Sequence, residues 1–246
     1  MSAVEERDRV RDHVLELADS DPRVVAAAVI GSLALGQGDR WSDLDFTFGV
    51  AEGASVADVM DDWTRELAEA FDAVPLLDLA SGDLIYRVFL LADWLQVDLS
   101  FAPKSIRQTS PTFRLLFGAH TAEFAPPPSA RNLFGWAVLY TRHAVVGVAR
   151  GQWWHAEYCI SCVRDQALTL ACLRRDLPTG HAKGFDQLPS DVRDSFDGAL
   201  VHSLERKELL RALGVAVTGL LREAVDVQDM IAKVEGQVRE LTTAPE

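Results

Sequence analysis

Two short stretches decide the fold: VVAAAVIGS at residues 24–32 and DLDFTF at residues 43–48. The first is a run of β-branched and small apolar residues that ends in Gly-Ser, which is typical of a buried strand. The second alternates polar and apolar residues, which is the period-2 pattern of a strand with one polar face. The sequence therefore predicts two strands, the second of which presents Asp43 and Asp45 on a single face.

Helices and further strands are predicted around these stretches. Apolar residues at helical spacing predict a helix over 4–18, which a Ser-Asp-Pro sequence ends. Ser55 begins a capping-box pattern, and the apolar face that follows predicts a helix that continues to Phe71. Two strand-like runs, 84–91 and 95–101, are close enough in sequence to form a hairpin. The first half of the chain thus has the pattern of an α/β unit.

Three consecutive prolines at 126–128 mark a break in the chain, because proline continues neither a helix nor a central strand. We expect a domain boundary there, with one domain over residues 1–125 and a second over 126–246. Beyond the prolines the pattern is helical. The expected helices span 131–149, 153–175, 190–202, 204–223 and 226–241. The predicted fold class is α+β: a mixed sheet with flanking helices, followed by an α-helical bundle.

Composition excludes several classes of protein. The chain of 246 residues has 24 basic and 37 acidic residues, and its net charge of −13 argues against a groove that binds a nucleic-acid backbone. The same charge is compatible with a cationic small substrate. No apolar run reaches the roughly 18–20 residues that cross a membrane, and the N-terminus lacks the pattern of a secretory signal. From the lack of a long apolar run we expect no membrane partner. Three cysteines cannot form a disulfide framework, so we expect a cytoplasmic protein.

Acidic residues on the predicted strands are spaced to meet at one cation. Asp43 and Asp45 are two residues apart on one strand, so their α-carbons lie roughly 6–7 Å apart. Asp98, between Val97 and Leu99 in another strand-like run, can supply a third carboxylate from a neighbouring strand. At ~4 Å each pair of like charges costs about 4 kcal/mol at an effective dielectric constant of 20, so the cluster requires a hard cation. Carboxylate oxygens suit Mg²⁺ or Mn²⁺.

Gly31 and Ser32, at the end of the first strand, are suited to phosphate binding. Glycine has no Cβ to block the approach of a phosphate group, and backbone N–H groups and the serine hydroxyl can donate hydrogen bonds to it. A phosphate site beside a cluster of carboxylates has the groups that a two-metal-ion displacement at phosphorus requires.

These motifs resemble the signature of the nucleotidyltransferase superfamily, which is an apolar segment, Gly-Ser, about ten residues and then Asp-apolar-Asp. The resemblance covers roughly residues 24–101. The change to a helical second half is similar to the antibiotic nucleotidyltransferases, which transfer a nucleoside monophosphate to a hydroxyl of an aminoglycoside or lincosamide. The resemblance implies a nucleotidyltransferase-type sheet and an adenylyltransferase that uses ATP and two Mg²⁺ ions, with Mn²⁺ as a substitute.

For the metal ions, the resemblance implies Asp43 and Asp45 as ligands. Asp98 occupies the place of the family's third acidic residue, which also serves as general base in several members. Asp98 would then bind metal and accept the proton of the acceptor hydroxyl, a contribution typically of about 10²–10⁴-fold in rate.

For the triphosphate, the resemblance implies contacts from Gly31, Ser32 and Ser42. Lys183 follows Thr-Gly-His-Ala in a segment similar to a loop whose lysine reaches the phosphates in streptomycin-type members. The sequence departs from the family at Leu33, where many members have an arginine. The positive charge would then come from another residue, and the candidates are Arg40, Arg174, Arg175 and Lys183.

Acidic residues of the second half are candidates for binding the acceptor. Glu157 and Asp165 are eight residues apart on the helix expected over 153–175, and so lie on nearly the same face. There they would receive ammonium groups of the substrate, although a solvated stripe has the same spacing. We expect the acceptor pocket at the domain interface. The expected partners are a nucleoside triphosphate and a small hydroxyl-bearing acceptor.

Two other functions fit the same residues. A nucleotidyltransferase that modifies a protein, of a toxin–antitoxin type, would have the same metal and nucleotide site. Transfer to a cognate protein rather than to a drug would distinguish it. A catalytically silent nucleotide-binding module is supported only by the missing arginine at Leu33. The main prediction is a Mg²⁺-dependent transfer of AMP from ATP to a small molecule.

Overall fold

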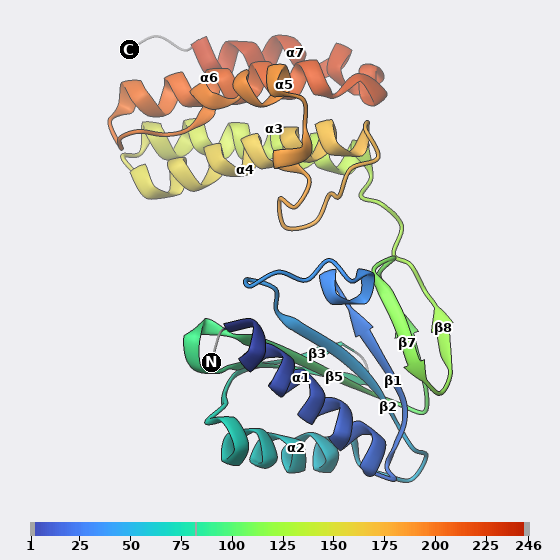
Figure 1. Cartoon of the computed structure of the whole chain (residues 1–246). Coiled ribbons are helices and arrows are strands. Elements are labelled where there is room, and N and C mark those ends of the chain that lie inside the picture. The colour runs from blue at the N-terminus through green and yellow to red at the C-terminus, as the bar shows by residue number, and fades with distance from the viewer. Residues whose placement is uncertain (1–2, 82, 244–246) are drawn as a thin grey trace. The chain divides into compact units, whose positions relative to one another are not determined.

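The computed structural model describes residues 3–81 and 83–243. The chain divides into two compact units, Met1–Ala125 and Pro126–Glu246 (Figure 1). The first unit is a mixed sheet with helices and the second is helical, so the predicted α+β class is confirmed. The outermost ends of the two expected domains, at residues 1 and 246, lie outside the described residues.

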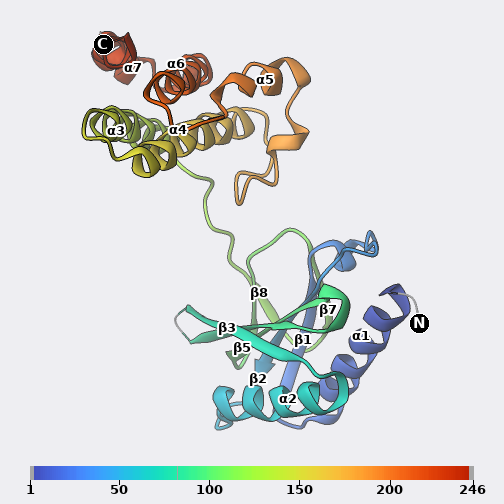
Figure 2. The same cartoon turned by 90° about the vertical axis from the view of Figure 1, so that its left-hand side faces the viewer.

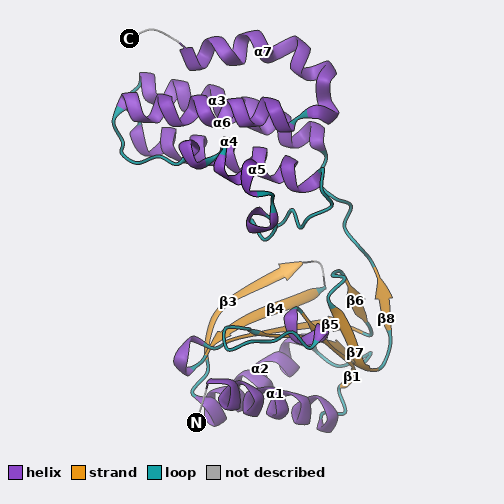
Figure 3. Ribbon diagram, turned by 45° about the horizontal axis from the view of Figure 1, so that its top comes forward, coloured by secondary structure: helices purple, strands orange, loops and turns teal. Residues whose placement is uncertain are grey.

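A six-stranded sheet is the centre of the N-terminal unit, in the order β3-β4-β5-β2-β1-β7 (Figure 3). Its strands are β1 (Val24–Ile30), β2 (Leu44–Val50), β3 (Val74–Ser81), β4 (Leu84–Leu90), β5 (Gln96–Pro103) and β7 (Phe113–Phe117). Strands β2 and β5 pair in parallel, and the other neighbours pair antiparallel. Two further strands, β6 (Ile106–Gln108) and β8 (His120–Ala122), form a small parallel sheet. The predicted strand over 24–30 and the predicted hairpin of β4 and β5 are therefore confirmed.

Two helices, α1 (Ala3–Ser20) and α2 (Val56–Phe71), lie on the same side of this sheet (Figures 1 and 2). Helix α2 begins as predicted, because the Ser55 side chain accepts a hydrogen bond from the backbone N–H of Asp58. Aromatic rings join the helix to the sheet: Trp63 packs edge-on against Phe48 and Phe101, with ring centroids 4.8 and 5.2 Å apart. Burial of these large apolar surfaces holds the two layers together.

The opposite side of the sheet carries polar residues, and we call it the polar face. Side chains alternate along a strand, so Asp45 on β2 lies opposite in direction to the buried Phe46. Residues directly opposite in a ladder share a face. Asp98 pairs with Asp45, and Tyr86 pairs with Ser100, so these side chains lie on the polar face as well. In this part of the chain both described helices are on the other side.

The C-terminal unit is a bundle of α3 (Ala130–Ala149), α4 (Trp153–Leu173), α5 (Ser190–Asp194), α6 (Arg206–Glu223) and α7 (Gln228–Thr243). Helices α3 and α4 approach closely where Gly147 meets Ala156, since a Cβ on Gly147 would lie 3.2 Å from that residue. The helix predicted over 190–202 is wrong in length: α5 ends at Asp194 and a short 3-10 turn follows. Arg211 donates to the carbonyls of Gly198 and Leu200, which satisfies them without a longer helix.

Strand β3 was not predicted, because its sequence lacks the alternating pattern. It is an edge strand with one neighbour, and the ladder has a register shift between Pro75 and Leu77. Proline is tolerated at such an edge because no ladder hydrogen bond is lost there. Within residues 3–81 and 83–243, no helix is both long and apolar enough to cross a bilayer.

Candidate active site

Three carboxylates meet on the polar face, and we call them the carboxylate triad: Asp43, Asp45 and Asp98. The parallel register of β2 and β5 sets Asp45 directly beside Asp98. Asp43 precedes Asp45 by two residues. One oxygen of each lies within 4.8 Å of the others. Asp98 is buried, with 3% of its surface exposed, whereas Asp43 and Asp45 are half-buried. The structure therefore brings the three predicted metal ligands together.

The buried carboxylate of Asp98 is held by two neutral donors. The Tyr86 hydroxyl donates to Oδ2, and Gln96 Nε2 lies 3.0 Å from Oδ1 and 2.9 Å from Oδ2. Burial, followed by the hydrogen bond to Asp98 and the charges of the triad, raises the pKa of Tyr86 far above its ordinary value, so the phenol keeps its proton. Sequence reasoning missed both donors. The only local signal was Gln96, two residues before Asp98 on the same strand face.

Gly31 provides space beside the triad. Its φ of +75° lies in the left-handed region, and a Cβ there would lie 2.8 Å from Asp45 Oδ2. Its backbone N–H donates to the carbonyl of Thr112 at 3.1 Å, so the expected hydrogen bond from the Gly31 amide to a phosphate is already taken. Because Gly31 has no Cβ, its backbone can lie close to the carboxylate of Asp45.

Ser32 and Ser42 lie together in one hydrogen-bonded chain. The Ser32 hydroxyl donates to Ser42 Oγ at 3.0 Å, and Ser42 Oγ lies 3.1 Å from Asp39 Oδ1, to which it donates. The backbone N–H of Trp41 and then the Ser42 hydroxyl hold the pKa of Asp39 below its usual value. The chain fixes the loop that leads into β2 and sets two hydroxyls beside Gly31.

The basic residues considered for phosphate binding are not equivalent. Leu33 packs against the apolar core of its unit. Arg40 lies in the same unit as the triad, and its guanidinium is 4.1 Å from the centre of the Trp41 ring. Arg174 and Arg175 both donate to the buried Glu223 in the C-terminal unit, which occupies them structurally. Lys183 is exposed in a loop of that unit.

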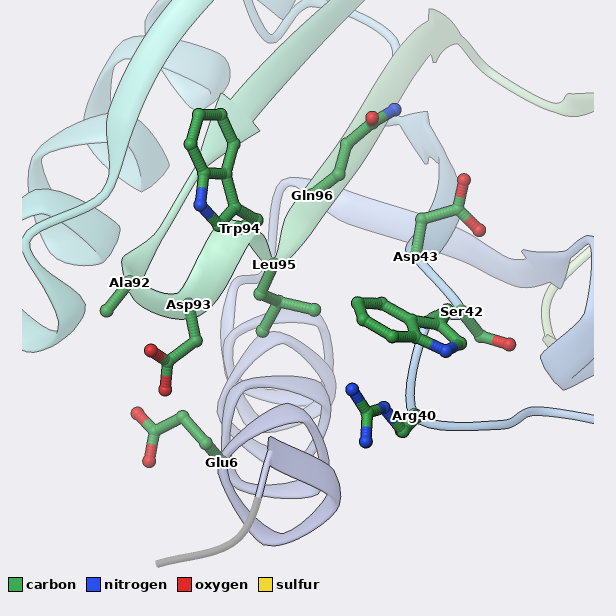
Figure 4. Close-up of a pocket in the computed structure, with 10 residues that line it drawn as sticks. Glu6, Arg40, Ser42, Asp43, Ala92, Asp93, Trp94, Leu95 and Gln96 are labelled. Atoms are coloured by element: carbon green, nitrogen blue, oxygen red, sulfur yellow. The ribbon is translucent and has the colours of Figure 1, made fainter.

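A cavity of about 160 Å³ adjoins the triad (Figure 4). Two tryptophans border it, Trp41 and Trp94, which are 77% and 85% exposed. Its other lining residues are Glu6, Arg40, Ser42, Asp43, Ala92, Asp93, Leu95 and Gln96. Asp93 and Trp94 have φ of 54° and 62° in the turn between β4 and β5. A left-handed backbone costs a residue other than glycine roughly 1–2 kcal/mol, so this turn is strained.

The two acceptor candidates of α4 already have partners in their own unit. Glu157 is half-buried, and its Oε1 accepts a hydrogen bond from Ser161 at 2.8 Å. Asp165 forms an ion pair with Arg164 at 2.9 Å. Burial raises the pKa of the Cys162 thiol, and the charges of Asp165 and Glu157 add to this. Within residues 3–81 and 83–243, no ion pair joins Glu157 to a basic side chain, so Glu157 is the stronger candidate of the two.

Known proteins resemble this chain in fold but not detectably in sequence family. No protein-family model matches the sequence, and no match was found among curated proteins. Among solved structures, the chain is similar to an aminoglycoside 6-adenyltransferase from Bacillus subtilis, with 12% identity and a TM-score of 0.40 over 95% of this chain and 97% of that one. A similarity of this size carries no argument about activity, which must follow from the side chains.

Proposed function

We propose that the protein is a divalent-metal-dependent nucleotidyltransferase that transfers a nucleoside monophosphate, AMP from ATP, to a hydroxyl of a small molecule. The observation that supports this best is the carboxylate triad, whose oxygens lie within 4.8 Å of one another beside Gly31. At that distance two carboxylates repel by about 3.5 kcal/mol at an effective dielectric constant of 20. A bound divalent cation removes this repulsion.

The donor set fits Mg²⁺ and Mn²⁺, because all three ligands are carboxylate oxygens. Asp43 and Asp45, which are half-buried, would hold the ions together with Asp98. When bound, such ions neutralise charge on the triphosphate and on the pyrophosphate leaving group.

Asp98 is suited to accept the proton of the acceptor hydroxyl. It is buried, and Tyr86 and Gln96 fix the direction of its oxygens. A base that is held in place does not have to be reoriented when the reaction starts, which lowers the barrier. The proton would pass from the acceptor hydroxyl to a carboxylate oxygen of Asp98 as the hydroxyl oxygen bonds to the α-phosphorus, the bond from that phosphorus to the bridging oxygen breaks, and pyrophosphate leaves.

The triphosphate would lie near Gly31, whose missing Cβ lets the Asp45 carboxylate come close to the backbone, and the hydroxyls of Ser32 and Ser42 would have to turn away from their present acceptors to donate to a phosphate. Lys183 of the C-terminal unit is proposed as a further phosphate contact. Glu157 and Asp165 of the same unit are proposed to bind an amine of the acceptor. For Lys183 the support is its charge and its exposure, and for the half-buried Glu157 and Asp165 it is the chemistry of the carboxylates alone.

The test is a screen for pyrophosphate release. Purified protein is incubated with Mg²⁺, each of the four nucleoside triphosphates and three groups of hydroxyl compounds: aminoglycosides, lincosamides and unrelated alcohols. Acceptor-dependent release with one group, lost in Asp45→Asn, is the expected result. Release with a co-purified protein but with none of the compounds would indicate a protein-modifying enzyme. Nucleotide binding without release under any condition would indicate a silent binding module and refute the proposal.

A further inference from the structure

We propose that Arg7 of α1 is a positioning residue for the nucleotide site: it holds the turn of residues 39–42, which carries the Ser42 hydroxyl and leads directly into the triad. The assignment rests on the proposed function, since it names a residue that acts through the side chains expected to bind the triphosphate and the metal ions. It concerns the N-terminal unit alone.

Arg7 is a charged residue on the buried side of its helix. Val10 and Val14 follow it at helical spacing and have no exposed surface, and Arg7 lies on the same stripe with 6% of its surface exposed. A guanidinium taken out of water loses several kcal/mol of solvation unless charges and hydrogen bonds replace the water. The contacts of Arg7 therefore show what this burial achieves.

The pairing of Arg7 is weak for a buried cation. Its Nη2 lies 3.2 Å from Asp8 Oδ1, and that carboxylate oxygen also accepts from Arg11 at 2.9 Å. The Nε of Arg7 is buried and has no hydrogen-bond partner within the described part of the chain. A buried donor without an acceptor lowers stability, so the stability of the fold does not by itself explain Arg7.

The remaining donor of Arg7 reaches the turn before β2. Its Nη1 donates to the backbone carbonyl of Asp39, which also accepts from the N–H of Ser42 at 3.2 Å. Asp39 N–H donates to Ser42 Oγ at 2.9 Å, and Trp41 N–H donates to Asp39 Oδ1 at 2.9 Å. These three bonds lie within the turn, whereas the bond from Arg7 joins the turn to α1.

Gly38, directly before the turn, makes room for this contact. A Cβ on Gly38 would clash with the Leu33 side chain and would lie 3.5 Å from Arg7 Nη1. The backbone of the loop thus lies close against the guanidinium, and the absence of a side chain at Gly38 permits it.

The turn transmits the position of Arg7 to the site. Ser42 Oγ accepts from the Ser32 hydroxyl at 3.0 Å, and Asp43 of the triad is the next residue of the chain. Displacement of the turn therefore moves a proposed phosphate donor and a proposed metal ligand together. Since a misplacement of 1 Å can cost about 10²-fold in rate, a rigid anchor matters here more than a charge does.

Lysine cannot replace arginine in this role. The planar guanidinium donates to Asp39 and Asp8 from two nitrogens in a fixed geometry, whereas the lysine ammonium is a single centre on a flexible chain. Arg7→Lys keeps the charge and loses the geometry, and Arg7→Met loses both. The pair of variants separates positioning from simple electrostatic attraction.

The first experiment observes the turn itself, without nucleotide. Trp41 lies in the turn and is 77% exposed, so protein labelled with 5-fluorotryptophan gives a ¹⁹F NMR signal for it, which Trp41→Phe assigns. We expect Arg7→Lys and Arg7→Met to shift or broaden this signal. Arg11→Met is the matched control, since it removes a cation from the same helix and from the same Asp8, and its Trp41 signal should stay as in wild type.

The second experiment measures the Kd of a non-hydrolysable ATP analogue with Mg²⁺, at a temperature where every variant is folded. Both Arg7 variants should raise this Kd at least fivefold, and Arg11→Met should stay within twofold of wild type. A residue with a purely structural role would lower Tm and leave the Kd of the folded protein unchanged.

An unchanged Trp41 signal in both Arg7 variants would refute the assignment, and so would loss of folding in both. Wild-type affinity in Arg7→Lys with weak binding in Arg7→Met would show that charge suffices, which also refutes positioning. If the Trp41 signal moves but wild type does not bind the analogue, the proposed function is refuted and Arg7 remains the anchor of the turn. If Arg7→Met alone does not fold, Arg7→Lys decides the question by its Trp41 signal and its Kd.

Discussion

Replacing Asp45 by asparagine should stabilise the protein without metal and abolish its stabilisation by metal and nucleotide. The triad oxygens lie within 4.8 Å of one another, and two charges at that distance repel by about 3.5 kcal/mol at an effective dielectric constant of 20. Asp43 and Asp45 are half-buried, so solvent and salt reduce the net repulsion to roughly 1–2 kcal/mol. For a unit of this size that corresponds to a rise in Tm of roughly 3–8 °C.

Stabilisation by bound metal and nucleotide should require Asp45, although Asp45 lowers the stability of the metal-free protein. A ligand at 100 times its Kd stabilises the native state by about 2.7 kcal/mol, which is roughly 10 °C in Tm. Wild type should show this shift with Mg²⁺ and a non-hydrolysable triphosphate. Asp45→Asn should show almost none, because it loses one of the three carboxylate ligands and with it a full negative charge that attracts the cation.

Scanning calorimetry at several Mg²⁺ concentrations measures both effects. Asp19→Asn is the matched control, since Asp19 is exposed at the end of α1, away from the triad. It should behave as wild type in every condition. A full ligand-induced shift in Asp45→Asn would refute the assignment of the metal site. A metal-free variant less stable than wild type would refute the electrostatic reasoning.

Other substitutions test separate parts of the molecule. Gly31→Ala should cost about 2–4 kcal/mol in urea unfolding and weaken nucleotide binding, because its Cβ would lie 2.8 Å from a triad oxygen at φ +75°. Tyr86→Phe should lower kcat about tenfold and leave both KM values unchanged, since the triad loses a positioning hydrogen bond. Hydrogen bonds from Arg23 lower the pKa of Asp21 to about 2, so Asp21→Asn should lower the free energy of unfolding by about 2 kcal/mol at pH 7. The loss should be complete above pH ~4 and should vanish as pH falls toward 2, where Asp21 of the wild type becomes protonated. Denaturation curves across that pH range measure it. Glu157→Gln should raise the KM of the acceptor and leave that of the nucleotide unchanged, and equal kinetics would make it an ordinary surface residue.

Local patterns were sufficient for the elements whose signal lies within a few residues. Strand β1 follows from an unbroken apolar run, and the start of α2 follows from the hydroxyl of Ser55. Asp45 lies on β2 and Asp43 immediately before it, so a spacing of two residues was enough to predict that the two carboxylates come together. Each of these depends on backbone geometry that neighbouring residues set by themselves.

The site itself depends on contacts between distant segments. Asp98 joins the triad only because β2 and β5 pair in parallel, and no pattern within either strand encodes that register. Tyr86 reaches Asp98 from a third strand, and the cavity exists only where the strained turn that holds Trp94 meets the loop before β2. Strand pairing and turn conformation minimise the free energy of the whole unit, so they bring side chains together that sequence spacing alone leaves apart.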